Sequence, residues 1–106
     1  LEKCPNVQKA INYCAENDKY IASICAAPSI LGHKGLLKGE EAVCYYGFED
    51  QLTGARVADK PVCVSNKYIT ARGAGVALEF ALQLVEVLTS KERRETLESS
   101  LICAKK

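Results

Sequence analysis

Apolar side chains recur at helical spacing early in the chain and again toward its end. Over residues 5–17 the apolar positions fall on one helical face and a proline stands in the first turn, which predicts an amphipathic helix. Residues 78–88 carry the longest helical pattern of the chain. Thr89 and Glu92 have the spacing of a capping box, so a last helix is expected to run to about residue 99.

Shorter β-type runs separate these helices. They predict strands over residues 20–24, 42–45, 62–64 and 68–70. The last two strands flank Ser65–Lys67 and suit a hairpin. A short helix over 26–33, stopped by Gly35, follows the first strand. Residues 47–54 hold so many turn formers and charges that they predict a loop or one distorted turn.

Strands that alternate with helices are typical of an α/β architecture, in which helices cover both faces of a largely parallel sheet. This chain opens on a helix with no strand before it, and offers fewer than the roughly five strands of an open doubly wound sheet. We therefore expect residues 1–106 to be the later part of a larger domain. Its first strands would come from another polypeptide or would have been lost by processing.

The composition is that of one soluble globular unit, with 48% hydrophobic and 25% charged residues. A formal net charge of +1 leaves no surplus to hold nucleic acid or an anionic membrane surface. The basic run over 91–95 is interpreted as the solvated face of the terminal helix. No targeting segment and no apolar stretch long enough to cross a bilayer is recognisable, so we expect a cytoplasmic protein.

The chain contains 6 cysteines, which are too sparse for a disulfide-stapled secreted domain and form no C-x-x-C pair. Reduced thiols are expected. Because His33 is the single histidine, the ligand spacing of a zinc site is absent, and we expect neither a metal nor a cofactor. Cysteines other than Cys25 lie in apolar patterns and are interpreted as packing residues.

Cys25 stands at the junction between the first strand and the short helix, at the edge where open α/β folds bind their ligands. The free amides and positive dipole end of that helix would favour its thiolate form. Ala26 and Ala27 leave room for a reactant, and the amide that follows the nucleophile could bind an oxyanion. The alternative is that Cys25 is a small buried side chain, since free cysteines are commonly buried.

Other residues with possible chemistry lie downstream of Cys25. His33 is about 12 Å of helical rise away, too far to serve as its base, and is interpreted as a helix-end or core residue. Tyr45 and Tyr46 end a strand that could lie beside the first, either near Cys25 or as rim residues. The run "RGAG" (72–75) lacks the lysine of a phosphate loop and is expected to bring backbone close to Cys25.

Several longer runs resemble the second part of the ThiJ/PfpI family, also called the DJ-one family: "IASICAAPSILGHKGLLKG", "CYYGFED", "YITARGAGVALEFALQLVEVL" and "SKE". The resemblance implies a flavodoxin-like three-layer α/β sandwich, incomplete in this chain, and a homodimer of the full protein. It implies that Cys25 is the nucleophile and that the Ala26 amide faces an oxyanion. It also implies a glutamate and a glycine pair from the part of the domain before Leu1.

This chain departs from the family pattern at two positions. Tyr45 stands where several relatives have a histidine, so a hydrogen-bond donor replaces a base there. Ala74 stands where the family loop often has proline, while Arg72, Gly73 and Gly75 are retained. The resemblance therefore implies that backbone of Gly73, Ala74 and Gly75 lines the mouth of the site.

Three functions remain open from the sequence. The first is a cofactor-independent cysteine enzyme of the glyoxalase or deglycase type, acting on small reactive aldehydes. The second is an oxidative-stress sensor or chaperone-like protein that uses the same oxidisable cysteine. The third is a non-catalytic structural domain.

Overall fold

The computed structural model describes residues 2–90 and 92–93. The elements, in chain order, are α1 (Pro5–Glu16), β1 (Ile21–Ile24), α2 (Pro28–His33), β2 (Glu41–Ala42), η1 (Glu49–Gln51), β3 (Arg56–Val57), β4 (Val62–Ser65), β5 (Tyr68–Ala71), η2 (Ala74–Val76) and α3 (Ala77–Leu88), where η marks a 3₁₀ helix. The helix expected over 5–17, the first strand, the hairpin and the long helix are confirmed. In the described part of the chain, no helix is both long and apolar enough to span a membrane.

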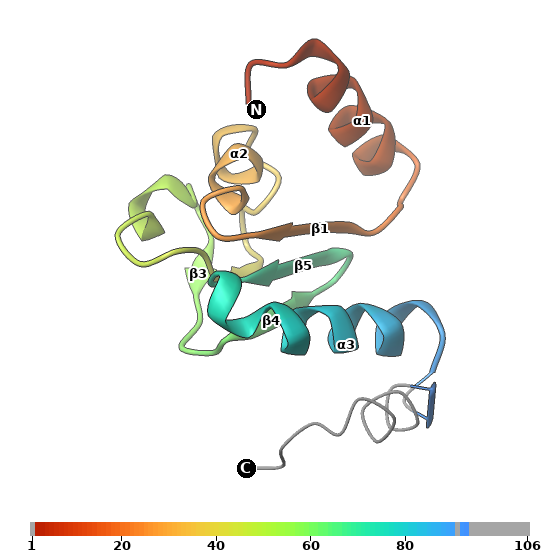
Figure 1. Cartoon of the computed structure of the whole chain (residues 1–106). Coiled ribbons are helices and arrows are strands. Elements are labelled where there is room, and N and C mark those ends of the chain that lie inside the picture. The colour runs from red at the N-terminus through yellow and green to blue at the C-terminus, as the bar shows by residue number, and fades with distance from the viewer. Residues whose placement is uncertain (1, 91, 94–106) are drawn as a thin grey trace.

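Parallel strand pairs dominate the two small sheets. β1 pairs in parallel with β5, which also pairs in antiparallel with β4, so the order is β1-β5-β4. β2 and β3 form a separate parallel pair. In Figure 1, α1 and α2 lie on one side of the β1–β5 pair and α3 lies on the other. The predicted α/β fold with a largely parallel sheet and helices on both sides is therefore confirmed.

The core is built around β5, whose four residues are all buried. It lies between β1 and β4, so both of its edges are paired, and α3 and β2 pack against it. Thr70 is the one polar residue of the described core, and its hydroxyl oxygen accepts the Val43 amide at 3.0 Å. Each fully buried aliphatic side chain, such as Leu31 or Leu37, contributes about 1.5–3 kcal/mol.

α2 packs closely on the loop that contains η1, and a glycine permits this contact. A Cβ atom added at Gly32 would lie 2.2 Å from the carbonyl oxygen of Gln51 and 2.8 Å from Cα of Leu52. No side chain fits in that space. The region 47–54, predicted to be a loop or one distorted turn, therefore contains a short helix held against α2.

Two strands differ from the prediction. β2 ends at Ala42, not at residue 45, because the chain then leaves the ladder and the Tyr45 amide bonds instead to the Cys25 carbonyl. β3 was not predicted at all. It has 2 residues, both exposed, and so carries no periodic apolar signal.

The end of α3 also differs in detail. The Thr89 hydroxyl donates to the Val85 carbonyl, and Ser90 rather than Thr89 accepts the amide of Arg93, at 3.1 Å. The predicted capping box of Thr89 and Glu92 is therefore wrong, and Ser90 is the residue whose hydroxyl accepts a capping bond. The rest of the last helix, to about residue 99, and most of the basic run 91–95 lie outside the described residues.

Candidate functional site

Cys25 adopts a left-handed backbone conformation, with φ of 66°. For a residue other than glycine this conformation costs about 1–2 kcal/mol. It persists because both backbone groups of Cys25 are held at the end of the sheet: its amide donates to Ala71 O at 3.0 Å, and its carbonyl accepts the Tyr45 amide at 2.7 Å. The structure therefore fixes the direction in which the chain turns at the thiol.

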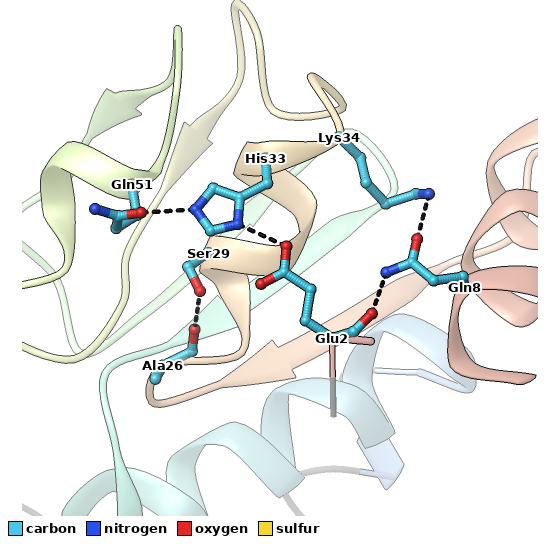
Figure 2. A network of polar contacts seen from close by, with 7 residues as sticks. All are labelled: Glu2, Gln8, Ala26, Ser29, His33, Lys34 and Gln51. Atoms are coloured by element: carbon cyan, nitrogen blue, oxygen red, sulfur yellow. Dashed lines mark hydrogen bonds and ion pairs between the residues drawn. The ribbon is translucent and has the colours of Figure 1, made fainter. Parts of the chain in front are cut away.

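The Cys25 turn, defined as residues 25–27, leads into α2. The Ala27 amide donates to Ile24 O at 3.2 Å, whereas the Ala26 amide donates to no acceptor among the described residues. The Ala26 carbonyl accepts both the amide and the hydroxyl of Ser29, at 3.1 and 2.6 Å, as Figure 2 shows for the hydroxyl. α2 begins at Pro28, two residues later than predicted, because residues 26 and 27 complete the turn.

Ser29 was missed by the sequence analysis. A serine at the second position of a short helix carries no distinctive signal, yet the Ser29 hydroxyl donates a hydrogen bond to the carbonyl of Ala26. The peptide unit that follows Cys25 is therefore oriented by a side chain from α2. The Ala26 amide of this same turn, which directly follows Cys25 in the chain, has no acceptor in the described part of the structure.

The thiols of the described residues are free and lie in different environments. Cys25 is partly buried, whereas Cys44 and Cys63 are at most 1% exposed, and burial raises the pKa of both. The prediction that other cysteines are packing residues is confirmed for these two. It is wrong for Cys4, which is exposed before α1, where the Val7 and Asn6 amides lower the pKa of its thiol.

Tyr45 lies against both the Cys25 turn and the "RGAG" loop. Its amide bonds to Cys25 O, and a Cβ atom added at Gly73 would lie 3.5 Å from its ring atom Cδ1. Its ring also meets that of Phe48 edge-on, with centroids 6.4 Å apart. The structure thus brings together Cys25, Tyr45 and Gly73, which are far apart in the sequence.

A cavity of about 490 Å³ opens at this place. Three segments line it: Tyr45 and Tyr46, residues 59–61 and residues 72–76. The predicted site residues Gly73, Ala74 and Gly75 are all among them, whereas Cys25 is not and reaches the cavity wall through its bond to Tyr45. The wall formed by Asp59, Lys60 and Pro61 was missed, because a short polar loop gives no sign of which cavity it faces.

His33 belongs to a different cluster. One ring nitrogen lies 2.6 Å from Glu2 Oε2 and the other 2.6 Å from Gln51 Oε1 (Figure 2). Because both partners are acceptors, they favour the doubly protonated ring, and the bonds to Gln51 and Glu2 raise the pKa of His33. The interpretation of His33 as a helix-end residue is confirmed, since it is the last residue of α2.

The fold and this site define the class as a flavodoxin-like α/β protein with a cysteine where strand β1 turns into helix α2. Within that class, the chain belongs to the DJ-1/PfpI family, whose sequence model matches residues 1–87.

Individual relatives agree with this assignment. The chain is 34% identical to "Glutathione-independent glyoxalase DJR-1.2" of Caenorhabditis elegans, over 99% of this chain and 57% of that protein. It is similar to the structure "Toxoplasma gondii DJ-1, oxidized", with a TM-score of 0.90 and 38% identity over 98% of this chain and 57% of that one. Drosophila melanogaster DJ-1beta gives a TM-score of 0.86 at 31% identity, over 98% and 57%. The chain thus spans a little over half the length of these relatives.

Proposed function

We propose that the protein is a cofactor-independent, cysteine-dependent enzyme of the glyoxalase type, which acts on small reactive aldehydes. The observation that carries this proposal is the Cys25 turn: a partly buried cysteine in a strained left-handed conformation, followed by an amide that has no acceptor among the described residues. Strain of this kind is concentrated at functional sites. The name of the nematode relative supports the same reaction class.

The chemistry needs no external oxidant or reductant. The Cys25 thiolate adds to the aldehyde carbon of a 2-oxoaldehyde, and the resulting oxyanion accepts a hydrogen bond from the Ala26 amide. A proton then moves from the former aldehyde carbon to the neighbouring carbonyl carbon, which leaves a thioester of a 2-hydroxyacid. Water cleaves this thioester, so that the products are the hydroxyacid and the free thiolate.

The other site residues have supporting roles in this proposal. Tyr45 donates a hydrogen bond rather than accepting a proton, because a phenol is a poor base at neutral pH. Gly73, Ala74 and Gly75 form the wall that faces the substrate. The base is the glutamate that the family resemblance implies from before Leu1. A cavity of about 490 Å³ is roomy enough for a glycated side chain as well, so a deglycase reaction belongs to the same proposal.

We assign residues 1–106 to the C-terminal portion of a single ThiJ/PfpI-type domain in a cytoplasmic homodimer. Support comes from the free edge of β1, which pairs only with β5 among the described strands. The Ser23 hydroxyl on β1 is also buried with no hydrogen-bond partner in the described structure. Both features suit a further strand beside β1, supplied by the N-terminal segment of the domain.

The test is turnover of methylglyoxal to lactate by the full-length protein. Cys25→Ser should lower kcat/KM by at least about 100-fold, because the nucleophile is lost. Cys63→Ser is the matched control, since it changes a thiol that the mechanism does not use. Lactate formation that survives in Cys25→Ser would contradict the proposal.

An oxidative-stress sensor or chaperone-like protein is the second candidate. It is favoured by the partial exposure of the free Cys25 thiol and by the oxidised form of the Toxoplasma relative. Two equivalents of peroxide would convert the thiolate to a sulfinate, with release of water. Peptide mass spectrometry after a peroxide titration, together with the absence of cysteine-dependent lactate, would select this function over the enzyme.

A further inference from the structure

Arg72 follows β5, and its side chain is only 12% exposed although it borders the cavity. Nη1 donates to the Cys44 carbonyl at 3.1 Å and Nη2 donates to the Ala58 carbonyl at 2.9 Å. The Glu49 carboxylate lies 3.6 Å from Nη1. The guanidinium is therefore directed at the protein's own acceptors on three other segments.

These contacts lie on both sides of Tyr45 in the sequence. Cys44, whose carbonyl is bonded, precedes it, and Tyr46, whose ring centroid is 4.4 Å from Cζ of Arg72, follows it. β2 ends at Ala42, so strand pairing does not hold this stretch of chain. The Val43 and Tyr45 amides donate to Thr70 and Cys25, and the Tyr45 carbonyl accepts the Phe48 amide at 3.1 Å. The guanidinium adds the bond to the Cys44 carbonyl and the contact with the Tyr46 ring.

The same side chain joins the three walls of the cavity. It contacts the tyrosine wall through Tyr46 and reaches the wall of residues 59–61 through the Ala58 carbonyl. The backbone amide of Arg72 also donates to the Pro61 carbonyl at 3.1 Å, and Gly73, on the third wall, directly follows Arg72 in the chain. The guanidinium serves two carbonyls through two separate nitrogens while its plane contacts an aromatic ring, and the single nitrogen of a lysine ammonium does not reproduce this geometry.

We propose that Arg72 is a positioning residue: it holds residues 44–46 so that Tyr45 stays against the Cys25 turn, and it does not bind the substrate. An arginine beside a cavity is ordinarily interpreted as a ligand for a carboxylate or phosphate. Here two carbonyls, a carboxylate and a ring already surround the guanidinium. The activity readout below rests on the proposed function, whereas the structural readouts do not.

The experiment uses the full-length protein with 3-fluorotyrosine at position 45. In Arg72→Lys the fluorine resonance should shift or broaden, and kcat for methylglyoxal should fall about 10- to 100-fold with KM changed by less than about twofold. Tyr46→Leu, which removes the stacked ring but keeps Arg72, should change the resonance in the same direction by less. Lys60→Ala, which removes another cation of the cavity, is the control and should leave the resonance unchanged.

Two results would overturn the proposal. One is an unchanged Tyr45 resonance in folded Arg72→Lys, and the other is a rise in KM at unchanged kcat, which would make Arg72 a substrate ligand. If Arg72→Lys does not fold, Tyr46→Leu tests the proposal instead, because an unchanged Tyr45 resonance in that variant would show that the contact of Arg72 with Tyr46 does not position Tyr45. If the native protein turns over no aldehyde, the proposed function fails, while the Tyr45 resonance still decides the role of Arg72.

Discussion

Cys25 and Cys63 lie near opposite edges of the same three-stranded sheet, and the chain makes different use of each. Cys63 lies within β4, opposite Thr70 of β5, and is 1% exposed. Cys25 comes one residue after β1 ends, with its backbone turned into the left-handed region and its side chain partly exposed. The residue before each cysteine does not show which thiol is reactive, because both cysteines follow an apolar β-branched residue. The difference shows that the path of the backbone, rather than the residue type, decides which thiol is presented to a reactant.

The two sites also differ in what surrounds the sulfur. Burial raises the pKa of Cys63 and keeps reagents away, so its thiol behaves as a small apolar side chain. At Cys25 the next two residues are alanines, and the Ala26 amide is unbonded among the described residues. The strained backbone of this turn costs free energy, and strain of this kind is concentrated at functional sites. Four measurements test how far the two sites differ.

The largest expected contrast is in alkylation by iodoacetamide. In the native protein at pH 7, Cys25 should react about 100-fold faster than Cys63, because the thiolate is the nucleophile and Cys63 combines a raised pKa with burial. Peptide mass spectrometry over a time course gives both rates in one sample. Equal rates before unfolding would remove the distinction between the two sites.

Glycine substitution should separate the sites by stability. Cys63→Gly should lower the free energy of unfolding by about 2 kcal/mol, since it leaves a cavity and loosens a strand. Cys25→Gly should leave it unchanged or raise it by up to about 1 kcal/mol, because glycine adopts a positive φ without strain. Urea denaturation measures both. A large loss of stability in Cys25→Gly would mean that the turn is not strained.

Ser29→Ala tests the support of the Cys25 turn. Loss of the hydrogen bond to the Ala26 carbonyl should cost about 1 kcal/mol and slow the alkylation of Cys25 a few-fold, because the next peptide unit is no longer held. Ser65→Ala is the matched control: it removes a hydroxyl that bonds to Glu40 and accepts the Glu41 amide, away from Cys25. An equal effect of both variants on alkylation would refute a specific role for Ser29.

The smallest expected effect concerns the pH dependence at His33. Its pKa is raised in the folded state by Gln51 and Glu2, so its contribution to stability is complete below the unfolded value of about 6.5 and is lost as the pH rises through the folded value. His33→Asn should remove this loss, as seen in melting temperatures between pH 6 and pH 9. The alkylation rate of Cys25 should not change, since His33 belongs to another cluster. A changed rate would connect the two sites.

Elements with local patterns could be predicted from the amino-acid sequence. The apolar spacing of α1 and α3, the turn between β4 and β5, and the order of strand, Cys25 and helix all depend on neighbours a few residues apart. The candidate thiol could therefore be chosen in advance, and the family motifs supported Tyr45 and the Gly73–Gly75 loop. β3 could not be predicted, because two exposed residues carry no periodicity.

The contacts between these elements depend on the assembled fold. The positive φ of Cys25 depends on bonds to Ala71 and Tyr45, and the contacts of Arg72 reach the carbonyls of Cys44 and Ala58. These partners lie between 14 and 46 residues away in the chain, and their pairing requires the sheet to be assembled first. Local periodicity reports which face of an element is apolar, but it carries no record of which carbonyl a distant amide or guanidinium will reach.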